Sequence, residues 1–387
     1  MKKLYIYVFL LLTVFSCKDD TEDDFDIPKG RTLLIYLAGD NSLSGEVIDI
    51  FEALKEGWNP KTMGHLVILA DSKGNDMPML IKFGERKGVT VTDTLREYTN
   101  KNSASSELFS QVIADTKLIA PGESYGMLLF SHASGWLPER AFIDPINWGE
   151  PNVRQNVTPR SIFEDNKREM ELADFASAIP DGMFEFIASE MCFMSSVETA
   201  YALRNKTEYL LAAAPEMLSP GFTPIYKTSL DLLYKPKADL EGFGQAFFDY
   251  FNGLQGAFKS AAISLVRTSE MESLAALTRD ITSSLTSLPQ AQIDQIQHYD
   301  DNDNRPAKGI PHLFFDYADY MMQMATVEQA AQLEALLAKT VLFKINTPRL
   351  INVVITKHSG LSVYIPQISL PNLNKAYEET DWYKAVN

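Results

Sequence analysis

The sequence predicts an α/β fold in which helices cover both faces of a mostly parallel sheet. Short apolar runs that contain β-branched residues recur along the chain, as in strands buried on both faces. Segments whose apolar residues recur at helical spacing separate these runs over about 190 residues. Strands that alternate with helices in this way favour a parallel sheet with helices packed on each side.

The first strand and helix show both patterns. The run 31–38 (RTLLIYLA) is almost continuously apolar and predicts a buried strand. Turn-forming residues follow it, and apolar residues then recur at helical spacing between 47 and 54. We expect Asp40 and Asn41 to cap this helix, because short polar side chains accept hydrogen bonds from its first N–H groups.

The other elements of the sheet follow from the same patterns. Strands are predicted at 65–70, 79–83, 89–92, 125–131, 183–188 and 209–213, and helices at 106–118, 170–179 and 195–204. The turn-prone residues ERKG separate the strands at 79–83 and 89–92, which therefore favour a hairpin.

Past Pro224 helical patterns dominate. Helices are predicted at 240–251, 269–285, 313–324 and 327–339, and strands at 261–266, 351–356 and 361–365. No Pro- or Ser-rich linker marks a boundary there. We therefore predict a core at 30–225 and a largely helical C-terminal subdomain at 226–387 that packs on it.

The first residues have the features of a targeting segment. Two lysines precede the apolar run 4–15, which spans only ~18 Å as a helix and is too short to cross the ~30 Å hydrocarbon core. Residues 1–16 therefore indicate a signal peptide. The sequence VFSC ending at Cys17 resembles a bacterial lipobox, which predicts lipidation of Cys17 and attachment to a bacterial envelope membrane.

An acidic tether follows the lipidation site. Residues 18–26 carry five Asp and one Glu against one Lys. The segment has too few apolar groups for their burial to compensate for the conformational entropy lost on ordering. Residues 17–29 are therefore predicted to be a solvated tether. A charge run without a specific role is an equal alternative. The run also resembles the surface-export signal of some Gram-negative lipoproteins, which favours the outer membrane, with the protein facing the periplasm or the surface.

Composition excludes two classes of protein. The chain has 387 residues and a formal net charge of −16, without a Lys/Arg cluster, so nucleic acid is a poor candidate partner. Its only cysteines are Cys17 and Cys192, which excludes a disulfide scaffold.

Two reactive side chains follow predicted strands directly. His132 comes after the strand at 125–131, and Cys192 follows the strand at 183–188. Ligands of open α/β sheets bind outside the carboxyl ends of the strands, so the two would be neighbours if these strands pair. A histidine can activate a thiol as a nucleophile. Spacing alone leaves open an inert buried cysteine and a structural histidine.

Several blocks together resemble the clostripain family of cysteine peptidases. They are LLIYLAGDNSL (33–43), the strand with SHASGW (125–136), IASEMCFMSSVETAYALRNKTEYLLAAAPE (187–216), GLSVYIP (360–366) and the closing DW (381–382). The resemblance implies a caspase-like α/β/α sandwich and cleavage after Arg or Lys. It also implies catalytic roles for His132 and Cys192, and peptide or protein substrates with exposed Arg or Lys.

Two positions depart from the family pattern. Ala133 stands where the family usually has a glycine whose N–H, with that of Cys192, would bind the oxyanion. If position 133 needs a positive φ, the Cβ adds strain there. Glu190 stands where the family commonly has an aspartate that binds the basic side chain of the substrate; an ordinary loop carboxylate is the alternative.

The segment 137–169 is a long polar connection that contains several basic residues, namely Arg140, Arg154, Arg160, Lys167 and Arg168. Long loops in compact domains are usually functional or disordered, and a peptidase specific for basic residues could cut itself here. We therefore predict self-processing in 137–169.

No metal site or cofactor is predicted. The histidines at 65, 298, 312 and 358 have no Cys or second His at ligand spacing, so no zinc site is indicated. Residues 300–304 (DDNDN) lack the glycine and terminal glutamate of an EF-hand loop, and a solvated turn is expected there. Calcium activation stays open without a clear site.

Two other functions compete with a peptidase. One is a catalytically inactive clostripain-like surface lipoprotein that acts as a binding module, for which Ala133 is the only hint. The other is an adhesion or scavenging protein whose sheet merely presents loops.

Overall fold

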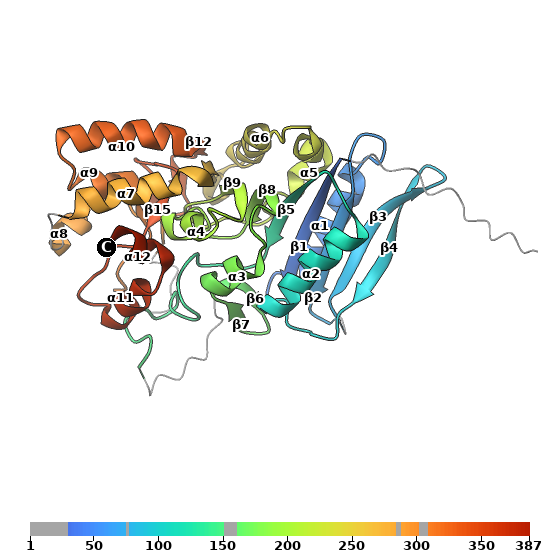
Figure 1. The fold of residues 1–387 in the computed structure, drawn as a ribbon, viewed down its shortest axis with the longest axis horizontal. Coiled ribbons are helices and arrows are strands. Elements are labelled where there is room, and N and C mark those ends of the chain that lie inside the picture. Colours follow the sequence, from blue (N-terminus) through green and yellow to red (C-terminus); the bar gives the residue numbers. More distant parts are fainter. Residues whose placement is uncertain (1–29, 75–76, 151–160, 284–287, 302–308) are drawn as a thin grey trace, which may run out of the picture.

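A nine-stranded sheet forms the centre of the molecule in the computed structural model, which describes residues 30–74, 77–150, 161–283, 288–301 and 309–387 (Figure 1). The strand order is β12-β10-β9-β8-β5-β1-β2-β3-β4. In chain order the strands are β1 (Arg31–Gly39), β2 (Leu66–Ser72), β3 (Met79–Arg86), β4 (Val89–Glu97), β5 (Ser124–Phe130), β8 (Phe184–Glu190), β9 (Thr207–Ala212), β10 (Ala262–Arg267) and β12 (Val341–Asn346). Strands β2, β1, β5, β8 and β9 pair in parallel, and the two edges are antiparallel.

Helices cover both faces of this sheet (Figure 1). On one face lie α1 (Ser44–Gly57), α5 (Thr223–Ser229) and α6 (Leu240–Asn252), which pack with Leu33, Ile35 and Leu37 of β1. On the other lie α2 (Ser106–Ile119), α3 (Leu172–Ala178), α4 (Val197–Ala202) and α7 (Met271–Thr282), which pack with Leu34, Tyr36 and Ala38. Because successive side chains of a strand point to opposite faces, β1 contributes to both apolar clusters. This arrangement confirms the predicted α/β/α fold with its mostly parallel sheet.

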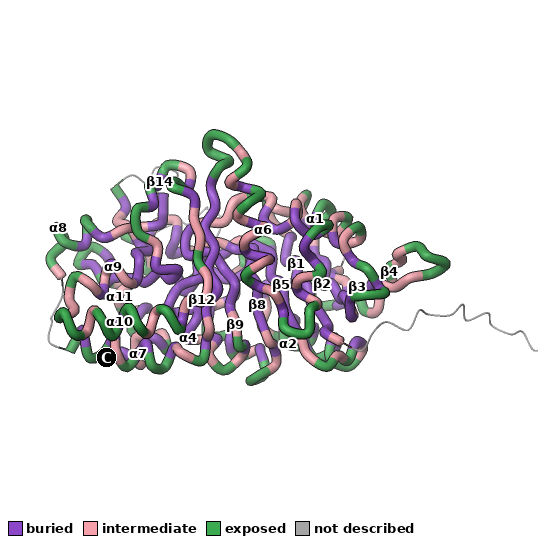
Figure 2. The backbone as a smooth tube through the Cα atoms, turned by 90° about the horizontal axis from the view of Figure 1, so that it is seen from above, coloured by how far each residue is buried: buried purple, intermediate pink, exposed green. Residues whose placement is uncertain are grey.

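Burial follows the position of each strand in the sheet. Figure 2 shows the central strands β1, β2, β5 and β8 as largely buried, whereas much of β4 is exposed. The almost continuous apolar runs of the sequence therefore correspond to strands covered on both faces.

The C-terminal part is more than a helical layer. Its further helices are α8 (Gln290–Ile293), α9 (Tyr317–Met322), α10 (Val327–Thr340), α11 (Pro371–Glu378) and α12 (Asp381–Val386). Strands β10 and β12 extend the central sheet beyond β9. The division into 30–225 and 226–387 stays a prediction, and both parts contribute strands to one sheet.

Some expected elements differ from the structure. Residues 313–324 are not one helix, because β11 (Phe315–Asp316) precedes α9 and pairs with β15 (Ser362–Val363). The strand expected at 351–356 is instead a small hairpin of β13 (Arg349–Leu350) and β14 (Val353–Val354). Strand β12 was not predicted, and neither was the hairpin of β6 (Ile162–Asp165) and β7 (Arg168–Met170).

Within the described ranges, no helix combines the length and the apolar character that crossing a membrane requires. The predicted signal peptide, Cys17 and the acidic tether lie outside these ranges.

Candidate active site

The loops that carry His132 and Cys192 leave the same edge of the sheet side by side. Strands β5 and β8 are parallel neighbours, and Phe130 pairs with Glu190 at their carboxyl ends. His132 and Cys192 each lie two residues beyond these paired positions. The register therefore places an imidazole and a thiol at equivalent points of adjacent strands.

Ser42 contacts the imidazole of His132. Its Oγ lies 2.7 Å from His132 Nε2, and it reaches this position from the loop after β1, the other neighbour of β5. Sequence reasoning missed this contact. The sequence did contain a hint of it, because Ser42 follows a buried strand closely and the site residues of α/β sheets lie past the carboxyl ends of the strands.

Asn41 links three segments around the histidine loop, and the prediction that it caps a helix is wrong. The N-cap of α1 is Leu43, which has no side-chain capping bond. The Asn41 side-chain amide donates instead to Ala38 O at 3.0 Å, Glu164 O at 2.7 Å and Ser131 Oγ at 3.4 Å. Asn41 therefore connects the end of β1 to β6 and to the loop that carries His132.

The cysteine loop is shaped by a residue in the left-handed region. Phe193 has a φ of +59°, an uncommon value for a residue with a side chain. Its N–H donates to Pro215 O at 2.9 Å, and its ring stacks on Phe314 at a centroid distance of 4.0 Å. The N–H of Met217 lies 3.4 Å from Cys192 Sγ as a donor. The thiol in turn lies 3.7 Å from Met217 O as a donor, so Met217 contacts Cys192 through both of its backbone polar groups.

Ala133 has ordinary backbone geometry. It is 2% exposed and bridges to Ile162, and its φ is not positive. The strain that a Cβ would add at a positive φ is therefore absent. Gly135 has the positive φ in this loop, +60°, and a Cβ there would lie 2.7 Å from Phe193 O.

Glu190 lies at the carboxyl end of β8, with its carboxyl group inside the protein. The residue is 6% exposed, and its Oε2 accepts the N–H of Phe222 at 2.7 Å while Oε1 accepts the hydroxyl of Tyr226. Burial raises the pKa of Glu190 to about 8, although both hydrogen bonds lower it. The side chain is therefore mostly protonated at pH 7 and bound to α5 and to the residue before it.

The segment 137–169, in which self-processing is predicted, is described only in part. Arg154 and Arg160 lie outside the described ranges, whereas Lys167 and Arg168 lie in the β6–β7 hairpin. A solvated turn was expected at 300–304. The first two residues of this segment do not fit that expectation, because Asp300 and Asp301 are buried.

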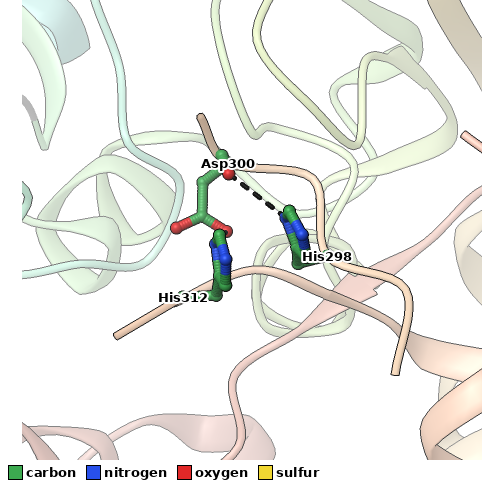
Figure 3. Close-up of side chains that lie close together, drawn as sticks. All are labelled: His298, Asp300 and His312. Carbon is green, nitrogen blue, oxygen red and sulfur yellow. Dashed lines mark hydrogen bonds and ion pairs between the residues drawn. The ribbon is translucent and has the colours of Figure 1, made fainter. Parts of the chain in front are cut away.

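One group of potential metal ligands occurs in the described part of the chain. His298, Asp300 and His312 each offer one ligand atom, and these atoms lie within 4.8 Å of one another (Figure 3). The spacing of these residues in the sequence did not reveal the group, because 12 positions separate Asp300 from His312. The bridge between His298 and Phe315 brings the two segments together.

Comparison with known proteins gives a consistent picture. The sequence model of the clostripain family (Peptidase_C11) matches residues 35–386. An inactive zymogen of a C11 protease from Parabacteroides distasonis is 31% identical and has a TM-score of 0.78, covering 93% of this chain and 99% of its own. No curated protein matches the chain.

Other solved structures share the fold at lower identity. A secreted C11 cysteine protease from Bacteroides thetaiotaomicron in complex with an irreversible peptide inhibitor is 23% identical with a TM-score of 0.76, over 93% of this chain and 99% of that one. The protease called iotapain, from the same organism, is 23% identical with a TM-score of 0.77, over 93% and 100%. The predicted caspase-like arrangement is confirmed by these similarities.

Proposed function

Because the chain belongs to the clostripain family of cysteine peptidases, we propose that it is an endopeptidase that cleaves after Arg or Lys through Cys192 and His132. The observation that carries this proposal is the parallel pairing of β5 and β8, whose register puts both side chains at one edge of the sheet. Its substrates are peptides or proteins with exposed basic residues.

The reaction proceeds through a covalent acyl-enzyme. The thiolate of Cys192 attacks the scissile carbonyl carbon, and the imidazolium of His132 gives its proton to the leaving amine as the C–N bond breaks. Water then attacks the thioester and gives a proton to His132, which releases the acid product and restores the thiolate. Met217 N–H supports the thiolate, and Ser42 orients the imidazole.

Backbone N–H groups of Ala133 and Cys192 stabilise the tetrahedral intermediate in this proposal. The loss of such a donor costs on the order of 100-fold in rate. The ordinary φ of Ala133 supports this role, because its N–H needs no strained backbone to point at the oxyanion. The same geometry weakens the only hint that favoured an inactive binding protein.

Glu190 recognises the basic side chain of the substrate in this proposal. Its position two residues before the nucleophile supports the assignment. Its carboxyl group is hydrogen-bonded to Phe222 N–H and to the Tyr226 hydroxyl, so a substrate cation must reach a carboxyl group that already has these partners. A cation that approaches the carboxyl group favours its ionised form, so substrate binding is accompanied by release of a proton from Glu190.

Hydrolysis of fluorogenic peptides tests the reaction. Peptides ending in Arg or Lys are compared with matched peptides ending in Leu, using the wild type and Cys192→Ala. We expect cleavage of the basic peptides only, with a loss of at least about 1,000-fold in Cys192→Ala. Equal cleavage by both proteins would exclude Cys192 as the nucleophile. No cleavage by either would favour the inactive surface lipoprotein or the adhesion protein.

Self-processing in 137–169 is the second part of the proposal. The similar protease from Parabacteroides distasonis is described as a zymogen, which supports a processing step in this chain. Purified wild type should yield two fragments on a denaturing gel, whereas Cys192→Ala should stay intact. N-terminal sequencing of the second fragment identifies the cleaved bond. Identical single bands for both proteins would contradict self-processing.

Attachment to the envelope is the third part. We propose that Cys17 carries the lipid and that the acidic segment 18–26 separates it from the folded peptidase at the outer membrane. Metabolic labelling with an alkyne fatty acid should mark the wild type and Cys192→Ala but not Cys17→Ser, which should leave the membrane fraction. Label on Cys17→Ser would refute the assignment.

A further inference from the structure

Two histidine rings and a buried carboxylate meet in the C-terminal part, among residues to which no catalytic role is assigned. The rings of His298 and His312 are stacked at a centroid distance of 3.5 Å and an interplanar angle of 15° (Figure 3). Asp300, which has no exposed surface, directs its Oδ1 to within 3.4 Å of His312 Nδ1. The three side chains thus combine two imidazoles with one carboxylate.

One ring nitrogen in this group has no hydrogen bond to the protein. His312 Nδ1 is buried, and its 3.4 Å approach to Asp300 Oδ1 lacks the geometry of a hydrogen bond. A buried polar atom without a hydrogen-bond partner is energetically unfavourable. His312 Nδ1 is therefore a nitrogen whose lone pair is available to a metal ion.

His298 is held in an orientation typical of a metal ligand. Its Nδ1 lies 3.3 Å from the backbone O of Asp300, and with the proton on Nδ1 this contact leaves the Nε2 lone pair for a ligand. Metal-binding histidines usually donate their other N–H to a backbone carbonyl or a carboxylate in this manner.

Asp300 is positioned by backbone donors of the later segment that carries His312. Its Oδ2 accepts the N–H of Leu313 at 3.0 Å and its Oδ1 that of Phe314 at 3.4 Å. The backbone O of His312 accepts the side-chain amide of Gln367 at 2.7 Å. These hydrogen bonds hold the Asp300 carboxylate and the backbone at His312, whereas the His312 ring is the part of the group that must turn.

We propose that His298, Asp300 and His312 bind a divalent transition-metal ion of the zinc class. Two imidazoles and one carboxylate are ligands that zinc accepts, with water as the fourth. Ligands at about 2.1 Å from a tetrahedral ion lie about 3.4 Å apart, so the present ligand atoms must approach one another by no more than about 1.4 Å. Rotation of an imidazole about its soft terminal torsion provides such a movement.

The site stands directly behind the nucleophile loop. Phe314, two residues after His312, stacks on Phe193, the residue that follows Cys192. A metal ion that joins His312 to His298 and Asp300 would fix the segment that supports Phe193. The ion is thus a structural element for the cysteine loop, and it takes no part in the reaction.

Calorimetric titration with Zn²⁺ tests the site in the full chain carrying Cys17→Ser and Cys192→Ala, purified without a polyhistidine tag. This background removes both thiols, which also bind zinc, and makes the result independent of peptidase activity. We expect one ion per chain and a Tm that rises with zinc concentration and returns after chelation. Calcium should not compete, because it prefers oxygen ligands.

Substitutions identify the ligands. His312→Ala and His298→Gln should each weaken zinc binding at least about 10-fold, while His65→Ala, an imidazole outside the group, should bind as the parent does. Circular dichroism checks the fold of each metal-free variant, and binding retained by either folded ligand variant overturns the proposal. Absence of zinc binding by the parent also overturns it, whatever the outcome of the peptidase assays.

Discussion

At the level of single residues, the proposed catalytic histidine is oriented by a side chain from the loop that follows another strand. Ser42 Oγ lies 2.7 Å from His132 Nε2, and the loop that carries Ser42 is fixed by Asn41. The imidazole therefore depends on the end of β1 for its orientation, although β5 carries it.

Removal of the Ser42 hydroxyl should slow the reaction without unfolding the protein. A net hydrogen bond contributes about 1 kcal/mol, so we expect Ser42→Ala to lower kcat/KM for Arg peptides about 5-fold and to change its pH profile. Ser42→Thr should restore much of the rate. Ser44→Ala, whose Oγ accepts from Lys73 N, is the control and should leave the pH profile unchanged.

Glu190 combines a buried carboxyl group with a proposed contact to substrate, and its titration separates the two roles. Its folded pKa of about 8 exceeds the unfolded value, so the folded state retains a proton that the unfolded state releases. Its contribution to stability is therefore present below the unfolded pKa and decreases as pH rises toward 8.

Glu190→Gln removes this dependence. The Tm difference between Glu190→Gln and the unsubstituted protein should shift in favour of the variant as pH rises from 5 to 8. Thermal unfolding of both proteins in the Cys192→Ala background measures this difference. At pH 7 in the active enzyme, the same change should lower kcat/KM for Arg peptides, although its Tm should not fall below that of the wild type. Unchanged kinetics together with the Tm trend would assign Glu190 to the fold alone.

At the scale of elements, two loops at the end of the sheet depend on a close approach between backbones. Gly135, in the loop after β5, has a φ of +60° and lies against Phe193 O, in the loop after β8. The fit of these loops keeps the histidine and cysteine segments in register beyond the last strand pair.

Gly135→Ala should disturb this fit. The left-handed backbone costs about 1–2 kcal/mol for a residue with a Cβ, and the Cβ meets Phe193 O at 2.7 Å. We expect a lower Tm and a loss of most activity. Gly182→Ala is the matched control, because its φ is +62° with nothing within 4 Å of the added Cβ, so it incurs the strain without the clash. Equal activity in both variants would contradict the role of the contact.

At the scale of the whole molecule, the sheet unites the two halves of the chain. Strand β10 pairs with β9, and the larger apolar cluster contains residues from both 30–225 and 226–387. Removal of the C-terminal half would expose the edge of β9 and much of this cluster to water.

A chain that ends at residue 225 should therefore fail to fold. Exposed strand edges and apolar surface favour aggregation, so we expect insoluble protein, measured as the soluble fraction after expression beside the full chain. A soluble fragment with a cooperative thermal transition would show that 30–225 folds independently.

Much of the central architecture was predictable from the sequence. The runs at 31–38, 65–70 and 125–131 are apolar on both faces, and only buried parallel strands readily accommodate such runs. Strand β12 escaped prediction because it lies at the edge of the sheet with half-buried side chains, and its sequence lacks a continuous apolar run.

The amino-acid sequence was enough to predict the order of the main strands and helices, the two reactive residues after strands, and the family that several sequence blocks resemble. The contacts of these residues emerge only when the chain is folded: Ser42 on His132, Met217 beside Cys192, and Tyr226 on Glu190. Folding also brings His298 and His312 together. Local patterns report which face of an element is buried, whereas contacts between distant segments depend on strand order and register, which local periodicity does not encode.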